Sequence, residues 1–302
     1  MSEPSGDRAA DKPRADGGHV RTTPSSNSVL SDFWVNFVRW NLKAIRNPFV
    51  VVGSLVQPII FLVLFTQVFG QIATSALGSG GGAGGITYET FLLPAIAMQV
   101  SLAAAAGSGI GLVNDMEEGM FEKTLVMPMS RSAMFLGKTA AEILRIVVQI
   151  AIILALGAFL GANVATGFVG AVGILGIGVL FSLWFIALSN IIAVVTRDQE
   201  STIIGANLLQ FPLLFVSTAF LPLDAMPDWI EVVATFNPIT YGVDAARALM
   251  LGQDVMTVIE VTRFGGIWNT LVPAIAVLLA LDIVFGGAMV YLLNRASSST
   301  VQ

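Results

Sequence analysis

The sequence predicts an all-α integral membrane protein, and its composition and hydropathy pattern both point to that class. Hydrophobic residues make up 55% of the 302-residue chain, and only 12% of residues are charged. Soluble domains carry about 25% charged residues, so this chain is too apolar for that class. Apolar runs of about 20 residues, the length that crosses a bilayer, recur along the chain. We therefore expect six transmembrane helices.

The six expected spans are separated by charged or glycine-rich segments. They are Phe49–Phe69, Phe91–Val113, Ala140–Leu160, Phe168–Val195, Thr202–Leu221 and Leu271–Leu293. Lysine and arginine gather in the short segments before the first span and after the second, fourth and sixth, whereas loops 70–90 and 161–167 have none. Because cytoplasmic loops carry the excess of these cations, both termini are expected on the cytoplasmic side of the plasma membrane.

Residues 28–47, ahead of the first span, predict an amphipathic helix. Its apolar residues recur at helical spacing, at Leu30, Phe33, Trp34 and Phe37, and its cations are Arg39, Lys43 and Arg46. A helix of this kind lies in the membrane interface. It is either a simple anchor for the first span or an elbow that braces a moving bundle. Polar residues 1–27 predict a disordered cytoplasmic tail, and 296–302 a second tail after a membrane domain at 48–295.

The chain lacks the side chains that most enzymes and metal sites need. It has no cysteine, and its single histidine, His19, lies in the polar tail. No nucleophile, base and metal set can be assembled, so we expect no enzyme activity, metal or cofactor in this chain. Asp282 falls in the middle of the sixth span, where a carboxylate needs a partner. Arg145 is a candidate partner, although Glu142 competes for it; a proton-coupled carrier is a further alternative.

The segment from Glu117 to Thr139, "EEGMFEKTLVMPMSRSAMFLGKT", ends like a nucleotide-binding P-loop. The P-loop pattern G-x-x-x-x-G-K-[ST] needs a glycine five residues before Gly137, where this chain has Ser132. A P-loop also follows a strand, and no apolar strand precedes this segment. We interpret Gly137-Lys138-Thr139 as a chance match, with Lys138 an interfacial cation at the end of the third span.

The first half of the same segment predicts a short charged helix between two spans. Asn114 is a suitable N-cap for a helix from Asp115 to Val126, and Pro128 would end it. Asp115, Glu118 and Glu122 would then share one face. Such a helix either inserts into a groove on a soluble partner or is an ordinary solvated loop helix.

Two strings of residues resemble the signatures of ABC-2 type permeases, and the resemblance covers about residues 30–295. The first is "NDMEEGMFEKTLVMPMSRSAMFLGK", which matches the family at Glu118, Gly119, Glu122, Leu125, Pro128, Ser130 and Arg131. The second is "FLPLDAMPDWIEVVATFNPITYGVDAARALMLG", which matches at Pro222, Pro227, Trp229, Asn237, Pro238, Tyr241, Arg247 and Gly252. Within the family, the chain is most similar to the daunorubicin-resistance and nodulation-export permeases.

The resemblance implies a membrane subunit that exports hydrophobic or amphipathic cargo, with glycan or lipid-linked polysaccharide export as the alternative. A second copy of the chain and two cytoplasmic ATP-binding subunits would complete the transporter. ATP and magnesium would bind those subunits, and no nucleic acid is expected. The implied coupling helix, which docks on the ATP-binding subunit, comprises Asp115, Glu117, Glu118, Gly119, Glu122, Leu125, Pro128 and Arg131.

Two further groups of residues have a functional and a structural interpretation. Residues 222–252 predict two short helices, one with Pro227 at its first position and one capped by Asn237 with Pro238 next. They are either interfacial helices or, as the family implies, a partly re-entrant outer gate with Pro222, Pro227, Trp229, Asn237, Pro238, Tyr241 and Arg247. Polar and aromatic residues in the spans line a cargo path or dimer interface, or only join helices: Gln99, Asn207, Gln210, Phe211 and Phe215.

Overall fold

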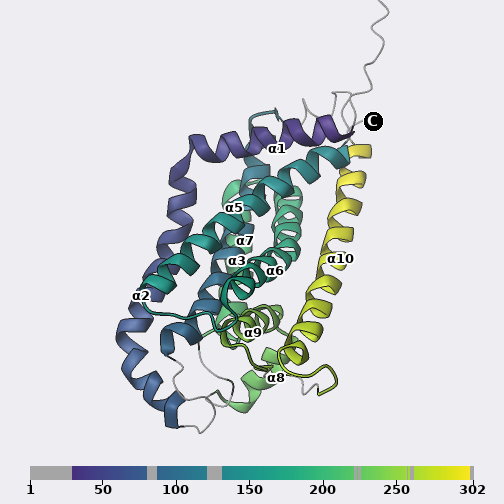
Figure 1. Cartoon of the computed structure of the whole chain (residues 1–302). Helices are drawn as coiled ribbons and strands as arrows, with labels where there is room; N and C mark the ends of the chain where they lie inside the picture. The colour runs from purple at the N-terminus through teal and green to yellow at the C-terminus, as the bar shows by residue number, and fades with distance from the viewer. Residues whose placement is uncertain are drawn as a thin grey trace, which may run out of the picture.

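The computed structural model describes residues 29–79, 87–120, 131–220, 223, 226–256, 258 and 262–299, and this part of the chain is helical without strands (Figure 1). The longer helices are α1 (Val29–Arg46), α2 (Pro48–Ser79), α3 (Tyr88–Glu117), α5 (Arg131–Phe159), α6 (Gly167–Thr196) and α10 (Trp268–Ser299). The shorter helices are α7 (Gln199–Phe215), α8 (Asp228–Phe236) and α9 (Pro238–Leu251). The predicted tail at 1–27 lies outside the described residues.

Five helices within the described residues are long and apolar enough to cross a membrane: Val52–Gly70, Tyr88–Glu117, Ala133–Phe159, Gly167–Thr196 and Trp268–Leu292. They correspond to the first four and the last of the predicted spans. The helix at the predicted fifth span, α7, has 17 residues and ends at Phe215, short of the predicted end at Leu221. The all-helical membrane class is therefore confirmed with five such helices.

The helices form an upright bundle with α3 at its centre. In Figure 1, α1 and the C-terminal end of α10 lie at one end of the bundle, and α8 and α9 lie at the other. We call these the α1 end and the α9 end. The helix α3 packs against α2, α5, α6, α7 and α9, which explains why most of its residues are buried.

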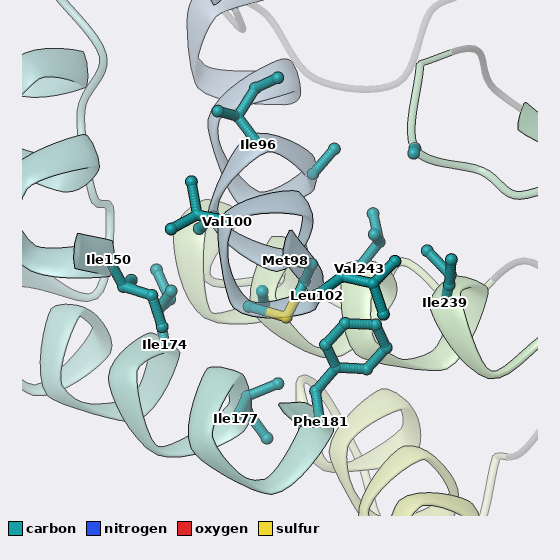
Figure 2. Packing of buried hydrophobic residues seen from close by; sticks show 14 of the residues in the cluster. Ile96, Met98, Val100, Leu102, Ile150, Ile174, Ile177, Phe181, Ile239 and Val243 are labelled. Carbon is teal, nitrogen blue, oxygen red and sulfur yellow. The ribbon is translucent and has the colours of Figure 1, made fainter. Parts of the chain in front are cut away.

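Branched aliphatic side chains fill the space around α3 (Figure 2). Ile96, Val100 and Leu102 of α3 lie among residues from three other helices, which are Ile150 of α5, Ile174, Ile177 and Phe181 of α6, and Ile239 and Val243 of α9. Small residues let the backbones approach closely, as membrane helices require. A Cβ at Gly109 would lie 2.3 Å from the Ser189 carbonyl oxygen, so α3 and α6 touch at that glycine.

Helix α1 turns its polar side toward the bundle and its apolar side outward. Asp32 and Asn36 are buried, whereas Leu30 and Trp34 of the predicted apolar face are exposed. A Cβ at Gly137 would lie 2.6 Å from the carbonyl oxygen of Phe33, so α1 crosses α5 in direct backbone contact. An outward apolar face suits a helix that lies against lipid, as the sequence predicts for 28–47.

Side-chain caps fix the ends of the shorter helices. Asp198 caps α7 by accepting the Ser201 N–H, and hydrogen bonding by Ser201 lowers the pKa of Asp198. Asn237 caps α9 by accepting the Ile239 N–H, with Pro238 at the first position, as predicted. Pro227 occupies the N-cap of α8 rather than its predicted first helical position.

We predict that Gly109→Val destabilises the protein, because the added side chain would collide with the backbone of α6. Overpacking of this kind costs about 1–3 kcal/mol. The matched control is Gly176→Val in α6, where an added Cβ meets nothing within 4 Å. Thermal unfolding in detergent should show a lower Tm for Gly109→Val and no comparable change for Gly176→Val. Equal Tm values for the two variants would show that α3 and α6 do not pack through Gly109.

Candidate functional site

The first of the predicted coupling residues, Asp115, Glu117 and Glu118, lie where α3 ends at the α1 end of the bundle. Asp115 is buried there and forms two ion pairs with α1, at 2.9 Å to Arg39 Nη2 and 2.9 Å to Lys43 Nζ. The predicted N-cap at Asn114 is wrong, because α3 continues through Asn114 and ends only at Glu117. A hydrophobic span and the start of the charged segment thus form one continuous helix, and α1 holds its last turn.

The chain leaves this point through an exposed acidic turn. Glu117 and Glu118 are exposed, and Gly119 has a φ of 66°, a backbone conformation that glycine adopts without strain. Asp115 therefore faces α1, while Glu117 and Glu118 face away from the bundle. Glu122, Leu125 and Pro128 lie outside the described residues, and Arg131 is the first residue of α5.

Two turns deeper, a buried polar cluster joins α3, α5 and α6; we call its members, Ser108, Lys138, Glu142 and Asn190, the Lys138 cluster. Lys138 Nζ lies 2.9 Å from Glu142 Oε1 and donates to Ser108 Oγ at 2.7 Å and Asn190 Oδ1 at 2.9 Å. Ser108 Oγ in turn donates to Glu142 Oε2 at 2.8 Å. Lys138 is thus not the interfacial cation predicted, because three polar groups hold its ammonium inside the bundle.

Trp40 of α1 connects the Lys138 cluster to the Asp115 ion pairs. Lys138 Nζ lies 5.2 Å from the centroid of the Trp40 ring, and Lys43 Nζ lies 5.3 Å from it. A Cβ at Gly111 of α3 would come within 3.1 Å of the same ring. A shift of α1 would therefore change contacts on both α3 and α5.

The P-loop-like tripeptide lies within α5, and the structure confirms that it is not a phosphate-binding loop. Gly137 packs against α1, and the Lys138 ammonium is fully engaged in the Lys138 cluster.

Two predicted pairings of charged residues are wrong. Glu142 pairs with Lys138 instead of Arg145. Arg145 Nη2 donates to the carbonyl oxygen of Ala104 at 2.9 Å instead of reaching Asp282. Both carboxyl oxygens of Asp282 are buried without a hydrogen-bond partner.

A second buried cluster lies at the α9 end, around Arg247. Its guanidinium donates to the Thr218 carbonyl oxygen at 2.9 Å and lies 3.4 Å from Asp244 Oδ1. It also stacks on the ring of Phe91 in α3, 3.9 Å from the ring centroid. Thr218 Oγ1 donates to Asp244 Oδ1 at 2.9 Å, which closes the cluster. Of the predicted gate residues, Arg247 thus joins α3, the end of α7 and α9.

The other predicted gate residues hold the two short helices together or face outward. Asn237 Nδ2 donates to the carbonyl oxygens of Leu213 and Val216, so this side chain caps both α9 and the end of α7. Tyr241 donates its hydroxyl to Thr235 of α8. Trp229 is 64% exposed on α8, and Pro222 lies outside the described residues.

Asp254 joins the segment between α9 and α10 to the start of α10 by hydrogen bonds. Its carboxylate accepts hydrogen bonds from Thr270 Oγ1 at 2.6 Å and Asn269 Nδ2 at 3.0 Å, in the first turn of α10. Desolvation raises the pKa of Asp254, but the hydrogen bonds from Thr270, Asn269 and the Met256 N–H outweigh it and lower that pKa overall.

The predicted cargo-path residues do not share one surface. Gln99 and Gln210 are buried, and neither amide atom of Gln99 has a hydrogen-bond partner. Asn207 and Phe215 are exposed, and Phe211, which lies between them on α7, is partly buried.

Phe215 belongs to an aromatic cluster that the sequence prediction missed. Its ring lies 5.7 Å from Phe220, which packs 5.1 Å from Phe65 of α2. Phe61 and Phe69 complete the row on α2. The four-residue spacing of Phe61, Phe65 and Phe69 was the available signal.

We predict that Lys138→Met strongly destabilises the fold, because it leaves the Glu142 carboxylate buried without its cation. Breaking a buried ion pair costs about 3–5 kcal/mol, whereas replacing both partners by apolar groups is often close to neutral. The double variant Lys138→Met/Glu142→Leu should therefore recover most of the loss in a denaturation assay. A neutral single variant, or a double variant with the summed loss of two singles, would contradict the pairing.

Comparison with known proteins places this chain in a family. Residues 31–251 match the family described as ABC-2 type transporter. The chain is 27% identical over 205 residues to the daunorubicin resistance ABC transporter permease protein DrrB1 of Streptomyces coeruleorubidus, covering 68% of this chain and 70% of that one. It is 24% identical to the probable doxorubicin resistance ABC transporter permease protein DrrC of Mycobacterium tuberculosis, over 70% of this chain and 74% of that one.

Other relatives carry broader names. The putative transport permease ycf38 of Cyanophora paradoxa is 28% identical, over 74% of this chain and 77% of its own length. The probable multidrug ABC transporter permease YbhR of Escherichia coli is 22% identical, over 64% of this chain and 50% of its own length. The match over residues 31–251 contains both polar clusters and four of the five apolar helices; only α10 lies beyond it. The chain is a multi-pass protein of the cell membrane that belongs to the ABC-2 type transporter family.

Proposed function

We propose that this chain is the membrane-spanning permease subunit of an ATP-driven ABC exporter and moves hydrophobic or amphipathic cargo out of the cell. Membership of the ABC-2 family and the names of its drug-resistance and multidrug relatives support the proposal. ATP and magnesium would bind a separate cytoplasmic ATP-binding subunit, two copies of which would serve two copies of this chain. No ATP hydrolysis is expected from this chain alone.

The observation that carries the proposal is the exposed acidic turn beside the buried Asp115. Its Glu117 and Glu118 face outward, while Asp115 fixes the base of the turn to Arg39 and Lys43 of α1. We propose that the segment from Asp115 to Arg131 docks on the ATP-binding subunit. Movement of that segment would pass through α3 and α5 to the Lys138 cluster and α6. In this proposal Asp115 positions the segment, and Glu118 and Glu122 contact the partner.

The same proposal assigns an orientation in the membrane to the bundle. The α1 end would be cytoplasmic, as the lysine and arginine distribution indicates. Helix α7 would be the predicted fifth span and would bring the total to six, since its 17 residues lie at the lower limit of the usual range. The α9 end would then face outside, with α9 as a partly re-entrant outer gate: residues 241–248 are all buried although the helix has only 14 residues.

The exposed face of α7 suits hydrophobic or amphipathic cargo better than glycan. The described part of α7 offers one exposed face with Asn207 and Phe215, continuous with the phenylalanines of α2. Aromatic surface with few polar groups suits apolar cargo. We propose this face as the cargo path or the interface with a second copy of the chain, and glycan or lipid-linked polysaccharide as the alternative cargo.

The proposed orientation predicts which positions an impermeant thiol reagent reaches. The chain has no cysteine, so single cysteines report without background. A reagent confined to the outside of intact cells should label Asp228→Cys on α8 and spare Glu118→Cys. Both should react after the membrane is opened. Labelling of position 118 alone in intact cells would invert the topology.

Charge reversal in the segment from Asp115 to Arg131 should uncouple the transporter. Glu118→Arg and Glu122→Arg should each weaken co-purification of the ATP-binding subunit and reduce export, while membrane insertion stays normal. A reversal in a desolvated interface costs about 2–5 kcal/mol, whereas losing a surface ion pair costs about 0–1 kcal/mol.

The control for these reversals is Glu200→Arg, on an exposed residue at the start of α7. It tests a second acidic position at the same end of the bundle. Wild-type behaviour of Glu118→Arg and Glu122→Arg, or equal disruption by Glu200→Arg, would identify the segment as a solvated loop and refute docking there.

A further inference from the structure

An ionisable side chain of α10 belongs to neither polar cluster and pairs with no other described residue. Asp282 lies near the middle of α10, and both of its carboxyl oxygens are buried with no hydrogen-bond partner. An acidic residue at the centre of a span is costly to insert unless it is paired or neutralised. Ionisable residues in such positions commonly mark substrate or ion pathways. A positively charged partner would therefore stabilise this carboxyl group.

The helices that pack on α10 supply no such partner. These are mainly α6 and α9. Helix α6 contains no Asp, Glu, Lys, Arg or His at all, and the charged residues of α9, Asp244 and Arg247, pair with each other. The backbone of Trp184 in α6 lies near the carboxyl group, but neither carboxyl oxygen has a partner at hydrogen-bonding geometry among the described residues.

The surroundings of Asp282 suit an organic cation. The surrounding side chains are aromatic: Trp184 of α6 is only 2% exposed and forms the wall behind Phe285 of α10. Phe285, three residues after Asp282 and so on the same side of α10, lies 5.9 Å from Trp184 between ring centroids. One turn beyond Asp282, a Cβ added at Gly286 would meet nothing within 4 Å, so there is open space on this side of the helix. Aromatic rings attract organic cations through their faces.

We propose that Asp282, with the partly buried ring of Phe285, recognises the positive charge of an amphipathic cation. The inference rests on the proposed export function, which it narrows to cationic cargo. Burying a carboxylate without a partner is costly, and a bound cation would offset that cost.

Binding of two probes of similar size and different charge tests the inference in nanodiscs. Tetraphenylphosphonium carries a fixed positive charge, and triphenylphosphine oxide is neutral. Asp282→Asn should weaken tetraphenylphosphonium binding about tenfold or more, as loss of a buried charge partner predicts, and leave triphenylphosphine oxide unchanged. Asp282→Glu should retain cation binding. Asp228→Asn, on exposed α8, is the matched control and should bind both probes like the wild type.

A second measurement uses the unaltered chain, so it does not depend on the variants folding. Dicyclohexylcarbodiimide modifies protonated carboxyl groups in apolar surroundings, and mass spectrometry locates the product. Tetraphenylphosphonium should protect Asp282 from modification, and triphenylphosphine oxide should not.

Three outcomes would overturn the inference. They are no tetraphenylphosphonium binding by the wild type, unchanged binding by Asp282→Asn, and equal modification of Asp282 with and without the cation. A change in oligomeric mass on Asp282→Asn with cation binding intact would assign Asp282 to contact with a second copy, which also refutes cation recognition. ATP-dependent export of neutral amphiphiles in any of these cases would show that the proposed function stands without it.

Discussion

The fold depends on the ammonium of Lys138, which is held inside the bundle by Glu142, Ser108 and Asn190. Apolar side chains provide little preference between helices in a bilayer, because lipid tails are as apolar as the side chains themselves. A buried cation with partners on α3, α5 and α6 does provide such a preference. Separating these helices would take Ser108 of α3 and Asn190 of α6 away from the Lys138 ammonium.

The contacts of Lys138 explain how a movement of the exposed turn could reach the interior of the bundle. Lys138 also contacts Trp40 of α1, and the last turn of α3 is paired with α1 through Asp115. The exposed turn after Asp115 is therefore attached to two helices that meet at the Lys138 cluster. At the α9 end, Arg247 and Asn237 make a comparable set of contacts between α3, α7 and α9. Polar side-chain contacts thus join the helices at both ends of the bundle, and aliphatic side chains pack between them (Figure 2).

Local sequence signals predicted the helices well and the polar partners poorly. The length of the apolar runs placed the five long apolar helices, and the Asn-Pro pair placed the start of α9, because both depend on neighbours in the chain. The interfacial helix was predicted from its apolar face, although its inward side carries Asp32 and Asn36. Asn114 was mistaken for a cap because its sequence suits one, while packing of α3 against α1 continues the helix past it.

Partners of charged residues depend on which helices meet, and sequence spacing does not give that. Arg145 was assigned to Asp282 and Glu142 because of distance along the chain and depth in the membrane. The structure instead places Lys138 between Glu142, Ser108 and Asn190, and gives Arg145 a backbone carbonyl. The i, i+4 spacing of Lys138 and Glu142 was visible, but a lysine near the end of a span is more often an interfacial cation.

Site-directed photo-crosslinking of the complex with its ATP-binding subunit tests the central claim most directly. A photoreactive amino acid at position 118 should crosslink to that subunit with high yield, and the same group at position 200 should do so weakly or not at all. The crosslink should depend on co-expression of the ATP-binding subunit. Absence of a crosslink at 118 from an assembled, transport-active complex would show that the turn between α3 and α5 is not where the partner docks.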